Sequence, residues 1–458
     1  MNKFIAKKFI VFGLGISGKA TIKFLLDNNY QVLASDDNLN SLNTLEKHPN
    51  LKIFNNDWNG IEALILAPGI PLYFPDPHPI VKAARKNNCP IICDIELLYK
   101  FNHQAKYIGI TGTNGKSTTT ALTGHIFQEN NINSAVGGNI GIPCLQLPRL
   151  KASDFYILEM SSFQLDLIHQ TKFFIASLLN ITPDHIDRHG SMEGYITAKK
   201  RIFMNQQKGD FAVIGVDNEN SRKVYDELKN NKDFQATLIP ISTKRILSDG
   251  ISVIDGIIHN NFPTFGKNEI NLGELPFLKG EHNAQNIAIA FANAFLSGIG
   301  ETKIINAIKT FKGLGHRMEL VGNIDNINFI NDSKATNAES TENALKSYKN
   351  IYWILGGKAK EGGIKMLEPY FSIIEHAFLM GEASDDFAKT LDGKVEYVKC
   401  QTLQNAFDIA YKKALSEKKS KQINILLSPA CASFDQWKNF EERGEYFCKL
   451  VKELKNEK

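Results

Sequence analysis

The sequence has few cysteines, and their spacing excludes two common roles. Its 458 residues contain six cysteines, and no two of them form a Cys-x-x-Cys pair. A disulfide framework is typical of short secreted chains, and structural zinc sites usually need closely spaced thiols. We therefore expect reduced thiols in a cytoplasmic protein, with neither disulfides nor a zinc site.

Long apolar runs and a strong excess of one charge are also missing. No apolar stretch reaches the roughly 18 residues that a membrane-spanning helix needs. The 53 basic and 49 acidic side chains leave a net charge of +4, which is too small to indicate nucleic-acid binding. An apolar run at 9–12 lies near the N-terminus without a cleavage-site pattern after it, so we expect a first strand rather than a signal peptide.

Length and composition favour a globular chain of about three domains. Hydrophobic residues make up 43% of the chain and charged residues 22%, as in folded proteins. Strand and helix patterns alternate throughout, which predicts an α/β fold. We expect a Rossmann-like domain at 1–104, a central P-loop ATPase-like parallel sheet at 105–312 and a Rossmann-like α/β domain at 313–458.

The strongest motif is Gly-Thr-Asn-Gly-Lys-Ser-Thr at 112–118. It follows a short apolar run and precedes a predicted helix at 119–129, and backbone N–H groups at a helix start bind phosphate. Lys116 can reach the terminal phosphates of a nucleotide, and the Ser117 hydroxyl can hold Mg²⁺. The common P-loop has glycine where this chain has Ile110, so the motif predicts a variant phosphate loop.

A carboxylate and a histidine follow two further predicted strands. Glu159 ends the apolar run 155–159, and the strand predicted at 176–180 leads into Asp184 and His185. Because the carboxyl ends of parallel strands meet at one edge of a sheet, we expect these side chains to lie near the phosphate loop. Their chemistry favours a metal or phosphate role.

The N-terminal segment carries a second glycine motif, Gly13-x-Gly15-x-x-Gly18, between a strand at 9–12 and a helix at 19–28. Asp36 follows the next predicted strand, as in dinucleotide-binding folds. The motif alone leaves NAD, FAD and another phosphorylated ligand open. An NAD-dependent oxidoreductase is therefore one alternative, although it leaves the phosphate loop unexplained.

Polar residues also gather at predicted helix starts further along the chain. Asn283 and Asn286 share one helix face and fit contacts to a base or ribose. Residues 428–436 offer hydroxyl and N–H groups before a helix, which suits a carboxylate ligand.

Together these motifs resemble the ATP-dependent Mur ligases of peptidoglycan synthesis. The likeness covers nearly the whole chain in order, and it rests on residues 112–118, 159–165, 184–185 and 315–317. Residues 331–337 and 428–443 are similar, more narrowly, to the members that add D-glutamate to UDP-N-acetylmuramoyl-L-alanine. Ligases for another amino acid, folylpolyglutamate synthases and a non-catalytic nucleotide-binding protein remain alternatives.

The resemblance implies a cytoplasmic enzyme that forms an amide through an acyl phosphate. It implies ATP and two Mg²⁺ ions as cofactors, UDP-N-acetylmuramoyl-L-alanine and D-glutamate as substrates, and a monomer without nucleic-acid partners. The first domain would then hold UDP rather than NAD.

The resemblance also implies a role for individual residues. Those expected at the UDP-sugar are Gly15, Ile16, Ser17, Asp36, Asp37, Pro68, Gly69 and Asn139. Those expected at ATP are Gly112, Thr113, Asn114, Gly115, Lys116, Ser117, Thr118, Asn283, Asn286, Arg317 and Asp332. Those expected at D-glutamate are Thr336, Lys360, Ser433 and Phe440. Metal ligands would be Ser117, Glu159, His185 and Lys199, the last as a carbamate. Lys116, His185, Lys199 and Lys334 would be catalytic.

Overall fold

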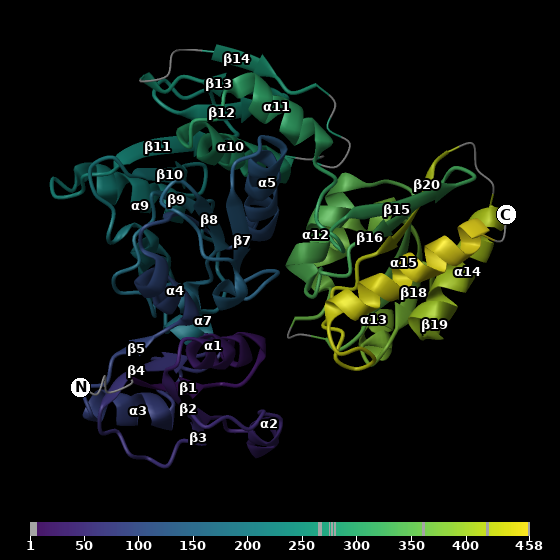
Figure 1. Ribbon diagram of the computed structural model, residues 1–458. Coiled ribbons are helices and arrows are strands. Elements are labelled where there is room, and N and C mark those ends of the chain that lie inside the picture. Colours follow the sequence, from purple (N-terminus) through teal and green to yellow (C-terminus); the bar gives the residue numbers. More distant parts are fainter. Residues whose placement is uncertain are drawn as a thin grey trace. The chain divides into compact units, whose positions relative to one another are not determined.

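The computed structural model describes residues 7–263, 268–273, 275, 278, 281–359, 362–417 and 421–456, with the backbone alone at 281, 282 and 456. Contacts divide the chain into unit 1, Met1–Glu274 with Asn283–Thr310, and unit 2, Leu275–His282 with Phe311–Lys458. Two sheets lie in unit 1 and a third in unit 2 (Figure 1). The parallel strands and intervening helices confirm the predicted α/β class, and the domain boundaries near 104 and 312 stay predictions.

The first sheet of unit 1 is parallel, with strand order β3-β2-β1-β4-β5. A central β1 with the chain winding to both sides is typical of nucleotide-binding sheets. Its strands are β1 Lys8–Phe12, β2 Gln31–Ser35, β3 Leu51–Ile53, β4 Ile61–Leu66 and β5 Ile91–Ile92. Its helices are α1 Ile16–Asp27, α2 Leu39–Asn43, α3 Pro79–Lys86 and α4 Asp94–Asn102. The helix predicted from residue 19 begins earlier, at Ile16, with Gly15 at its N-cap position.

The second sheet of unit 1 has the order β14-β13-β12-β11-β10-β9-β6-β8-β7. Its strands are β6 Lys106–Thr111, β7 Ser134–Gly138, β8 Phe155–Glu159, β9 Ile175–Leu178, β10 Phe211–Gly215, β11 Thr237–Ser242, β12 Ile251–Ile254, β13 Ile257–Asn260 and β14 Asn268–Asn271. Strands β6 to β12 are parallel to one another. Strands β13 and β14 run antiparallel to their neighbours. Because β6 lies between β8 and β9, the loops after these three strands are neighbours.

Helices surround this second sheet. They are α5 Lys116–Glu129, α6 Ser162–Leu165, α7 Ile186–His189, α8 Met192–Lys200, α9 Glu219–Asn230, α10 Glu281–Leu296 and α11 Glu301–Thr310, with short 3-10 turns at Cys144–Gln146 and Arg201–Phe203. The phosphate loop leaves β6 and enters α5, as the sequence predicts.

A buried carboxylate joins the two sheets of unit 1. Glu96 of α4 is inaccessible to solvent. Its two oxygens accept hydrogen bonds from the backbone N–H groups of residues 169–171, at 2.9–3.0 Å, and from the Thr171 hydroxyl at 2.6 Å. A buried charge is tolerated only when it is paired or fully hydrogen-bonded. Glu96 therefore fixes the helix that ends the first sheet to a loop of the second.

Unit 2 is a doubly wound sheet of order β15-β16-β20-β17-β18-β19, in which β15 is antiparallel to β16 and the other pairs are parallel. Its strands are β15 Glu319–Ile324, β16 Ile327–Asn331, β17 Ile351–Gly356, β18 Ile374–Met380, β19 Tyr397–Gln401 and β20 Ile423–Leu427. Its helices are α12 Ala338–Ser347, α13 Ser384–Leu391, α14 Leu403–Ser416 and α15 Phe440–Asn456, with a 3-10 segment at Lys365–Ile373.

The central strand β17 shows that helices cover both faces of this sheet. Tyr352 and Ile354 belong to a core that includes residues of α14 and α15, whereas Trp353 and Leu355 belong to a core that includes residues of α12 and α13. Alternate strand residues face opposite sides, so each side of the sheet packs against its own helix pair.

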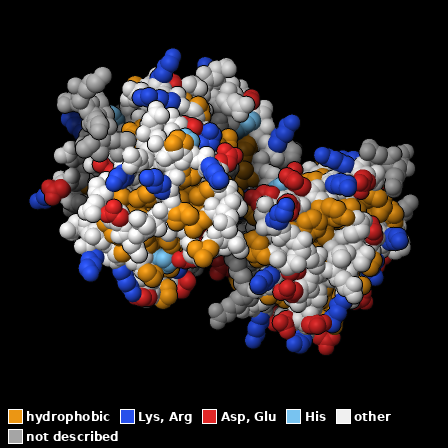
Figure 2. Space-filling view, turned by 60° about the horizontal axis from the view of Figure 1, so that its bottom comes forward, with side chains coloured by type: hydrophobic (Ala, Val, Ile, Leu, Met, Phe, Trp, Pro, Cys, Tyr) orange, Lys and Arg blue, Asp and Glu red, His pale blue; other side chains and the backbone are white. Residues whose placement is uncertain are grey.

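The distribution of charge on the surface and the apolarity of the helices agree with the small net charge and the short apolar runs of the sequence. Figure 2 shows basic and acidic side chains interspersed over the face that it draws. Among the helices that the structure describes, none combines the length and apolarity that a bilayer crossing requires.

Candidate active site

The phosphate loop of unit 1 is held in a closed turn by its own lysine. Lys116 Nζ donates hydrogen bonds to the carbonyl oxygens of Gly112, at 2.9 Å, and Thr113, at 2.8 Å. Gly115 has φ of +84°, and a Cβ there would overlap Asn286 Oδ1 and Leu179 Cδ2. Glycine is therefore required at this position. Helix α5 begins at Lys116 with Gly115 at its N-cap position, and backbone N–H groups at helix starts bind anions.

Lys199 of α8 lies against the same loop. Its side chain is almost wholly buried, and Nζ donates to the Gly112 carbonyl at 2.8 Å. Burial places the pKa of Lys199 well below its usual value and the nearby Lys116 charge lowers it further, while Asp184 and Glu159 oppose the shift. A lysine in such surroundings has access to its neutral, nucleophilic amine.

Glu159 supplies a carboxylate with an unsatisfied oxygen. It ends β8 and is 2% exposed, and its Oε1 accepts a hydrogen bond from Asn139 Nδ2 at 3.0 Å. Its Oε2 is buried and has no hydrogen-bond partner in the described part of the chain. Such an orphaned anionic oxygen is costly unless a cation or donor joins it. The residues present therefore fit a divalent cation, for which oxygen ligands are preferred.

His185 lies at the same edge of the sheet, in the loop after β9. Its backbone is left-handed, with φ of +51°, and its Nε2 is 3.4 Å from Asp184 Oδ2. Burial lowers the pKa of His185, Asp184 opposes this shift, and Lys116 and Lys199 reinforce it. A neutral imidazole is the form that binds metals. The structure thus brings Lys116, Glu159 and His185 within electrostatic reach of Lys199, and the catalytic and metal-binding roles of these residues stay predictions.

Two polar networks brace this group, and sequence reasoning missed both. Thr113 Oγ1 is 3.2 Å from the Tyr195 hydroxyl and accepts from Thr182 N at 3.0 Å. His189 Nε2 lies 2.9 Å from Ser162 Oγ, and burial lowers the pKa of His189 to about 4. Thr113 and Ser162 lie in stretches that carry the motifs, but the motifs do not show which side chains face each other.

The two asparagines of α10 that the sequence predicts at ATP lie beside the first turn of α5. Both are buried. Asn286 Oδ1 accepts a hydrogen bond from Thr119 Oγ1 at 3.1 Å, and Asn286 Nδ2 donates to Asn283 Oδ1 at 2.9 Å. Asn286 therefore supports the start of α5, and Asn283 orients the Asn286 amide. Asn114 N, within the loop, donates to Asn180 Oδ1 at 2.9 Å.

The residues predicted at a sugar nucleotide lie mostly at the carboxyl edge of the first sheet. Asp36 accepts from Leu14 N at 2.5 Å and from Asn38 N at 2.8 Å, so its carboxylate braces the glycine turn that contains Gly15, Ile16 and Ser17. Asp37 lies 3.1 Å from His78 Nε2. These contacts order the turn around an open edge where a ligand can bind.

One member of that predicted set, Gly69, connects the first sheet to α7. Arg188 Nη1 donates to the Gly69 carbonyl, next to Pro68, at 3.0 Å. Asn139 belongs with Glu159, as described above, rather than with the first sheet. The motifs gave no signal for Arg188, whose role depends on contacts between distant segments.

In unit 2 the predicted residues gather where β16 and β20 end. Asp332 is buried, and its Oδ2 accepts from Ser428 Oγ at 2.7 Å. Burial raises the pKa of Asp332 to about 7, while Ser428, Arg317 and Arg443 oppose the shift. Arg317 is therefore within electrostatic reach of Asp332.

The described residues predicted at an amino acid lie on the loops after β16 and β20 and at the start of α15. Lys334 Nζ lies 5.5 Å from the centre of the Phe440 ring, and Thr336 follows on the same loop, with its N–H bonded to the Lys334 carbonyl at 2.9 Å. Ser433 is buried in the loop after β20. Lys360, also predicted here, lies outside the described residues.

Arg443 organises these loops, although the sequence gave it no role. It is 1% exposed; Nε donates to Ser333 Oγ at 2.9 Å, and Nη2 donates to the carbonyls of Ser333, at 2.8 Å, and Cys431, at 3.2 Å. Burial lowers the pKa of Arg443 only to about 10, so the guanidinium stays charged at neutral pH. It ties the Asp332–Thr336 loop to the loop that carries Ser433.

Comparisons with known proteins agree with this arrangement. The Mur ligase middle domain family matches residues 110–294, and the family described as Mur ligase, glutamate ligase domain matches residues 316–431. The chain is 44% identical to the UDP-N-acetylmuramoylalanine--D-glutamate ligase of Rickettsia bellii, over 97% of each chain. It is 43% identical to the enzyme of the same name from Paramagnetospirillum magneticum, over 97% of this chain and 96% of the relative.

Solved structures support the fold at lower identity. A UDP-N-acetylmuramate-alanine ligase from Thermotoga maritima superposes with a TM-score of 0.59 at 16% identity, covering 98% of this chain and 100% of that one. A pseudomurein peptide ligase type C from Methanothermus fervidus gives 0.57 at 18% identity, with the same coverage.

Proposed function

The chain belongs to the Mur ligase family, and from that premise we propose that it joins D-glutamate to UDP-N-acetylmuramoyl-L-alanine at the expense of ATP in peptidoglycan precursor synthesis. The observation that carries the proposal is the 44% identity, over 97% of both chains, to a ligase named for that reaction. The cluster of Lys116, Glu159, His185 and Lys199 supports phosphoryl transfer as the chemistry. Hydride transfer would leave these four side chains without a role.

The reaction has to activate a carboxylate, which is a poor electrophile. The γ-phosphoryl group of ATP passes to a carboxylate oxygen of the alanyl residue, and ADP leaves. The D-glutamate amine then attacks the carbonyl carbon of the acyl phosphate, and the tetrahedral intermediate expels phosphate as the amine loses its proton. Positioning and charge stabilisation by the protein provide most of the rate enhancement in such transfers.

Lys116 and the start of α5 suit the nucleotide phosphates. The ammonium now donates to the Gly112 and Thr113 carbonyls, and phosphate oxygens are stronger acceptors for it. We expect ATP to draw Lys116 away from these carbonyls. In unit 2, Arg317 and Asp332 are expected to contribute to the ATP site, with Lys334 near the reacting groups and Thr336, Lys360, Ser433 and Phe440 around D-glutamate.

Mg²⁺ fits the donor set of unit 1. Ser117, Glu159 and His185, with Lys199 as a carbamate, would hold the two ions expected for the family, and the unpartnered Oε2 of Glu159 supports this assignment. When bound, the ions supply positive charge to the phosphates and the reacting carboxylate.

Lys199 is proposed to carry CO₂ as a carbamate. Its neutral amine would attack CO₂ and lose a proton, which converts a cationic side chain into an anionic ligand. Burial beside Lys116 favours the neutral amine. In that state the hydrogen bond from Lys199 Nζ to the Gly112 carbonyl has to be remade or lost.

Substrates that are soluble nucleotides and amino acids place the reaction in the cytoplasm in this proposal, with the enzyme acting as a monomer. The test is phosphate release from ATP with UDP-N-acetylmuramoyl-L-alanine, compared across D-glutamate, L-glutamate, L-lysine and diaminopimelate. We expect release with D-glutamate and loss of release in Lys116→Ala. Equal release with L-glutamate, or release without any amino acid, would contradict the proposal.

A further inference from the structure

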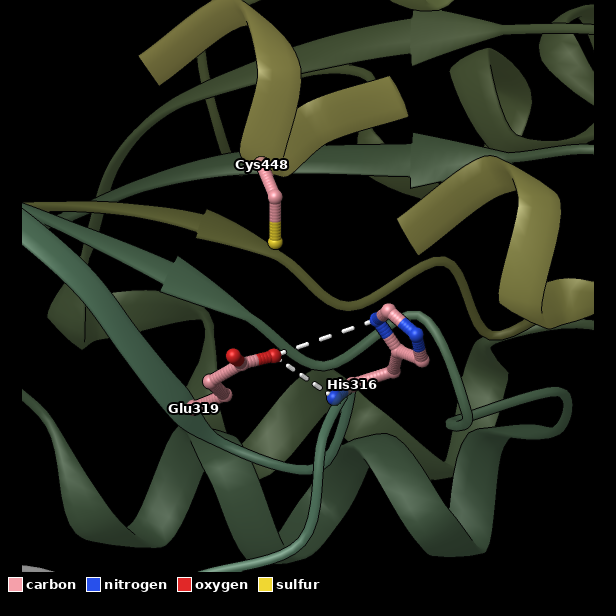
Figure 3. Close-up of side chains that lie close together, drawn as sticks. All are labelled: His316, Glu319 and Cys448. Atoms are coloured by element: carbon pink, nitrogen blue, oxygen red, sulfur yellow. Dashed lines mark hydrogen bonds and ion pairs between the residues drawn. The ribbon is translucent and has the colours of Figure 1, made fainter. Parts of the chain in front are cut away.

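Four polar side chains of unit 2 form a cluster that the proposed mechanism does not use. His316 Nδ1, a Glu319 carboxylate oxygen and Cys448 Sγ lie within 4.8 Å of one another (Figure 3). The space among them is taken by Asn331, whose Nδ2 lies 2.8 Å from His316 Nδ1 and 3.2 Å from Cys448 Sγ. A metal ion would have to displace this amide, so the cluster is better explained as a hydrogen-bond hub centred on Asn331.

The partners of Asn331 determine which way its amide faces. Asn331 is fully buried. On one side the Gly444 carbonyl, at 3.1 Å, and Glu319 Oε2, at 3.3 Å, are groups that can only accept. On the other side its Oδ1 accepts from Ser333 N at 3.2 Å. The NH₂ group must therefore face the cluster, which settles an orientation that geometry alone leaves open.

This orientation fixes the proton of His316. Since Asn331 Nδ2 is a donor, His316 Nδ1 must accept and carries no proton. Glu319 Oε2 is 3.8 Å from Nδ1, too far to hold a proton on Nδ1 through a hydrogen bond. The single proton of the neutral imidazole is thus on Nε2.

The backbone and the neighbouring helix keep the ring in this position. His316 N donates to Glu319 Oε2 at 2.8 Å, and the His316 carbonyl accepts from Lys334 N at 3.0 Å. A Cβ on Gly444 would overlap the imidazole, so glycine at this position in α15 lets the ring approach.

The protonated nitrogen faces away from the hub. Figure 3 shows Nε2 on the side of the ring opposite Glu319 and Cys448. The Phe440 ring is 6.5 Å away, and Lys334 Nζ lies over the same Phe440 ring. Arg317 is the next residue in the chain. His316 therefore lies next to Arg317 in the chain and beside the backbone of Lys334, two residues that the proposed function assigns to ATP and the reacting groups.

We propose that Asn331 is a positioning residue, which holds His316 as the Nε2–H tautomer so that His316 can donate a hydrogen bond to an anionic oxygen of bound ATP. This inference rests on the proposed function for the identity of the ligand, but not for the tautomer. The two parts can therefore be tested separately.

The tautomer is read from the imidazole nitrogen shifts of the full chain labelled with ¹⁵N-histidine, without substrates and at neutral pH, with His316 assigned from His316→Gln. The account expects Nε2 protonated and Nδ1 bare in the wild type. In Asn331→Asp the carboxylate can only accept, so Nδ1 should become protonated. Wild-type His316 with its proton on Nδ1 would overturn the proposal, whatever the ligase assay gives.

A matched control lies on the same strand. Asn328 bonds Asn323 and Asn424, at 2.9 and 3.0 Å, rather than the hub, so Asn328→Asp makes the same chemical change without touching His316. We expect it to leave the His316 signals unchanged. A shift of the His316 proton in Asn328→Asp equal to that in Asn331→Asp would show a general charge effect and refute the assignment to Asn331.

Steady-state kinetics test whether the Nε2–H tautomer of His316 contributes to ATP binding. Loss of a hydrogen bond to a charged group predicts a fall in kcat/KM for ATP of about tenfold to a hundredfold in Asn331→Asp, with a smaller change in KM for D-glutamate. In a His316→Gln background, where the side chain has no tautomers, Asn331→Asp should add little. The role in ATP binding would be refuted if Asn331→Asp and His316→Gln lowered kcat/KM for ATP by fully additive free energies. It would also be refuted if Asn331→Asp kept the wild-type kcat/KM for ATP. Failure of the wild type to use D-glutamate would instead refute the proposed function.

Discussion

Two buried cations, Lys199 in unit 1 and Arg443 in unit 2, are handled in opposite ways. Both are about 1% exposed. Lys199 donates to the Gly112 carbonyl, and burial places its pKa well below the usual value. Arg443 donates to three oxygens through two of its nitrogens, and its pKa falls only to about 10.

The difference in pKa between Lys199 and Arg443 indicates a different role for the cation in each unit. A lysine can give up its proton and become a nucleophile, whereas a guanidinium stays charged and offers donors in a fixed plane. Unit 1 therefore contains a group that can change chemically, and unit 2 contains a permanent cation that holds loops in place.

The largest expected effect comes from making the lysine permanently charged. Lys199→Arg cannot form a carbamate, so we expect kcat to fall by about a hundredfold to a thousandfold, as when one charge-stabilising group is removed from an active site. Lys200→Arg is the matched control, because Lys200 is a half-buried neighbour paired with Glu227 at 2.9 Å. A wild-type rate of phosphate release in Lys199→Arg would contradict the claim that Lys199 is a reactive group and Arg443 a permanent cation.

Removing the guanidinium of Arg443 should mainly lower the stability of the fold. Arg443→Met leaves the Ser333 and Cys431 carbonyls without their donor, so we expect the free energy of unfolding to fall by about 3 kcal/mol. Urea unfolding measures this change, with Lys438→Met as an exposed control on the same segment. Unchanged stability in Arg443→Met would show that the guanidinium does not hold the loops.

Two carboxylates of unit 1 show the same contrast between a structural role and a role in the reaction. Glu96 is saturated by backbone donors, so Glu96→Gln should lower the free energy of unfolding by about 2 kcal/mol. Glu159 has an unpartnered oxygen, so Glu159→Gln should leave stability equal or higher while reducing ligase activity and the affinity for Mg²⁺. The reverse pattern in unfolding and activity assays would contradict these roles.

A pH-dependent effect concerns the acid that faces the permanent cation. Burial raises the pKa of Asp332 from 3.8 to about 7, so the folded chain keeps this proton over a range where the unfolded chain has lost it. The stabilising contribution is complete below about pH 4 and is lost as the pH rises towards 7, by at most about 1.4 kcal/mol per pH unit. The difference in unfolding free energy between the wild type and Asp332→Asn should follow this slope, and a flat difference would contradict it.

Sequence patterns predicted the parts of the fold that depend on local periodicity. The strand at 31–35, the strand at 155–159 and the phosphate loop before α5 agree with the structure. The hairpin of β15 and β16 was missed, although its turn carries the signal: Asp325 and Asn326 both have left-handed backbones, which is typical of tight hairpin turns.

The candidate site was predictable only in part, for a physical reason. The glycine loop, Glu159 and His185 follow strands, so topology brings them to one edge of a sheet. The burial of Arg443 and the orientation of Asn331 depend on contacts between segments about a hundred residues apart in the chain. No local pattern encodes such contacts.

The carbamate on Lys199 can be observed directly. ¹³C spectra of the enzyme with Mg²⁺ and ¹³C-labelled bicarbonate should show a carbamate resonance in the wild type and in Lys200→Arg, and the same resonance should vanish in Lys199→Arg. A wild-type spectrum without that resonance, or one that Lys199→Arg leaves unchanged, would contradict the account of a reactive lysine in unit 1.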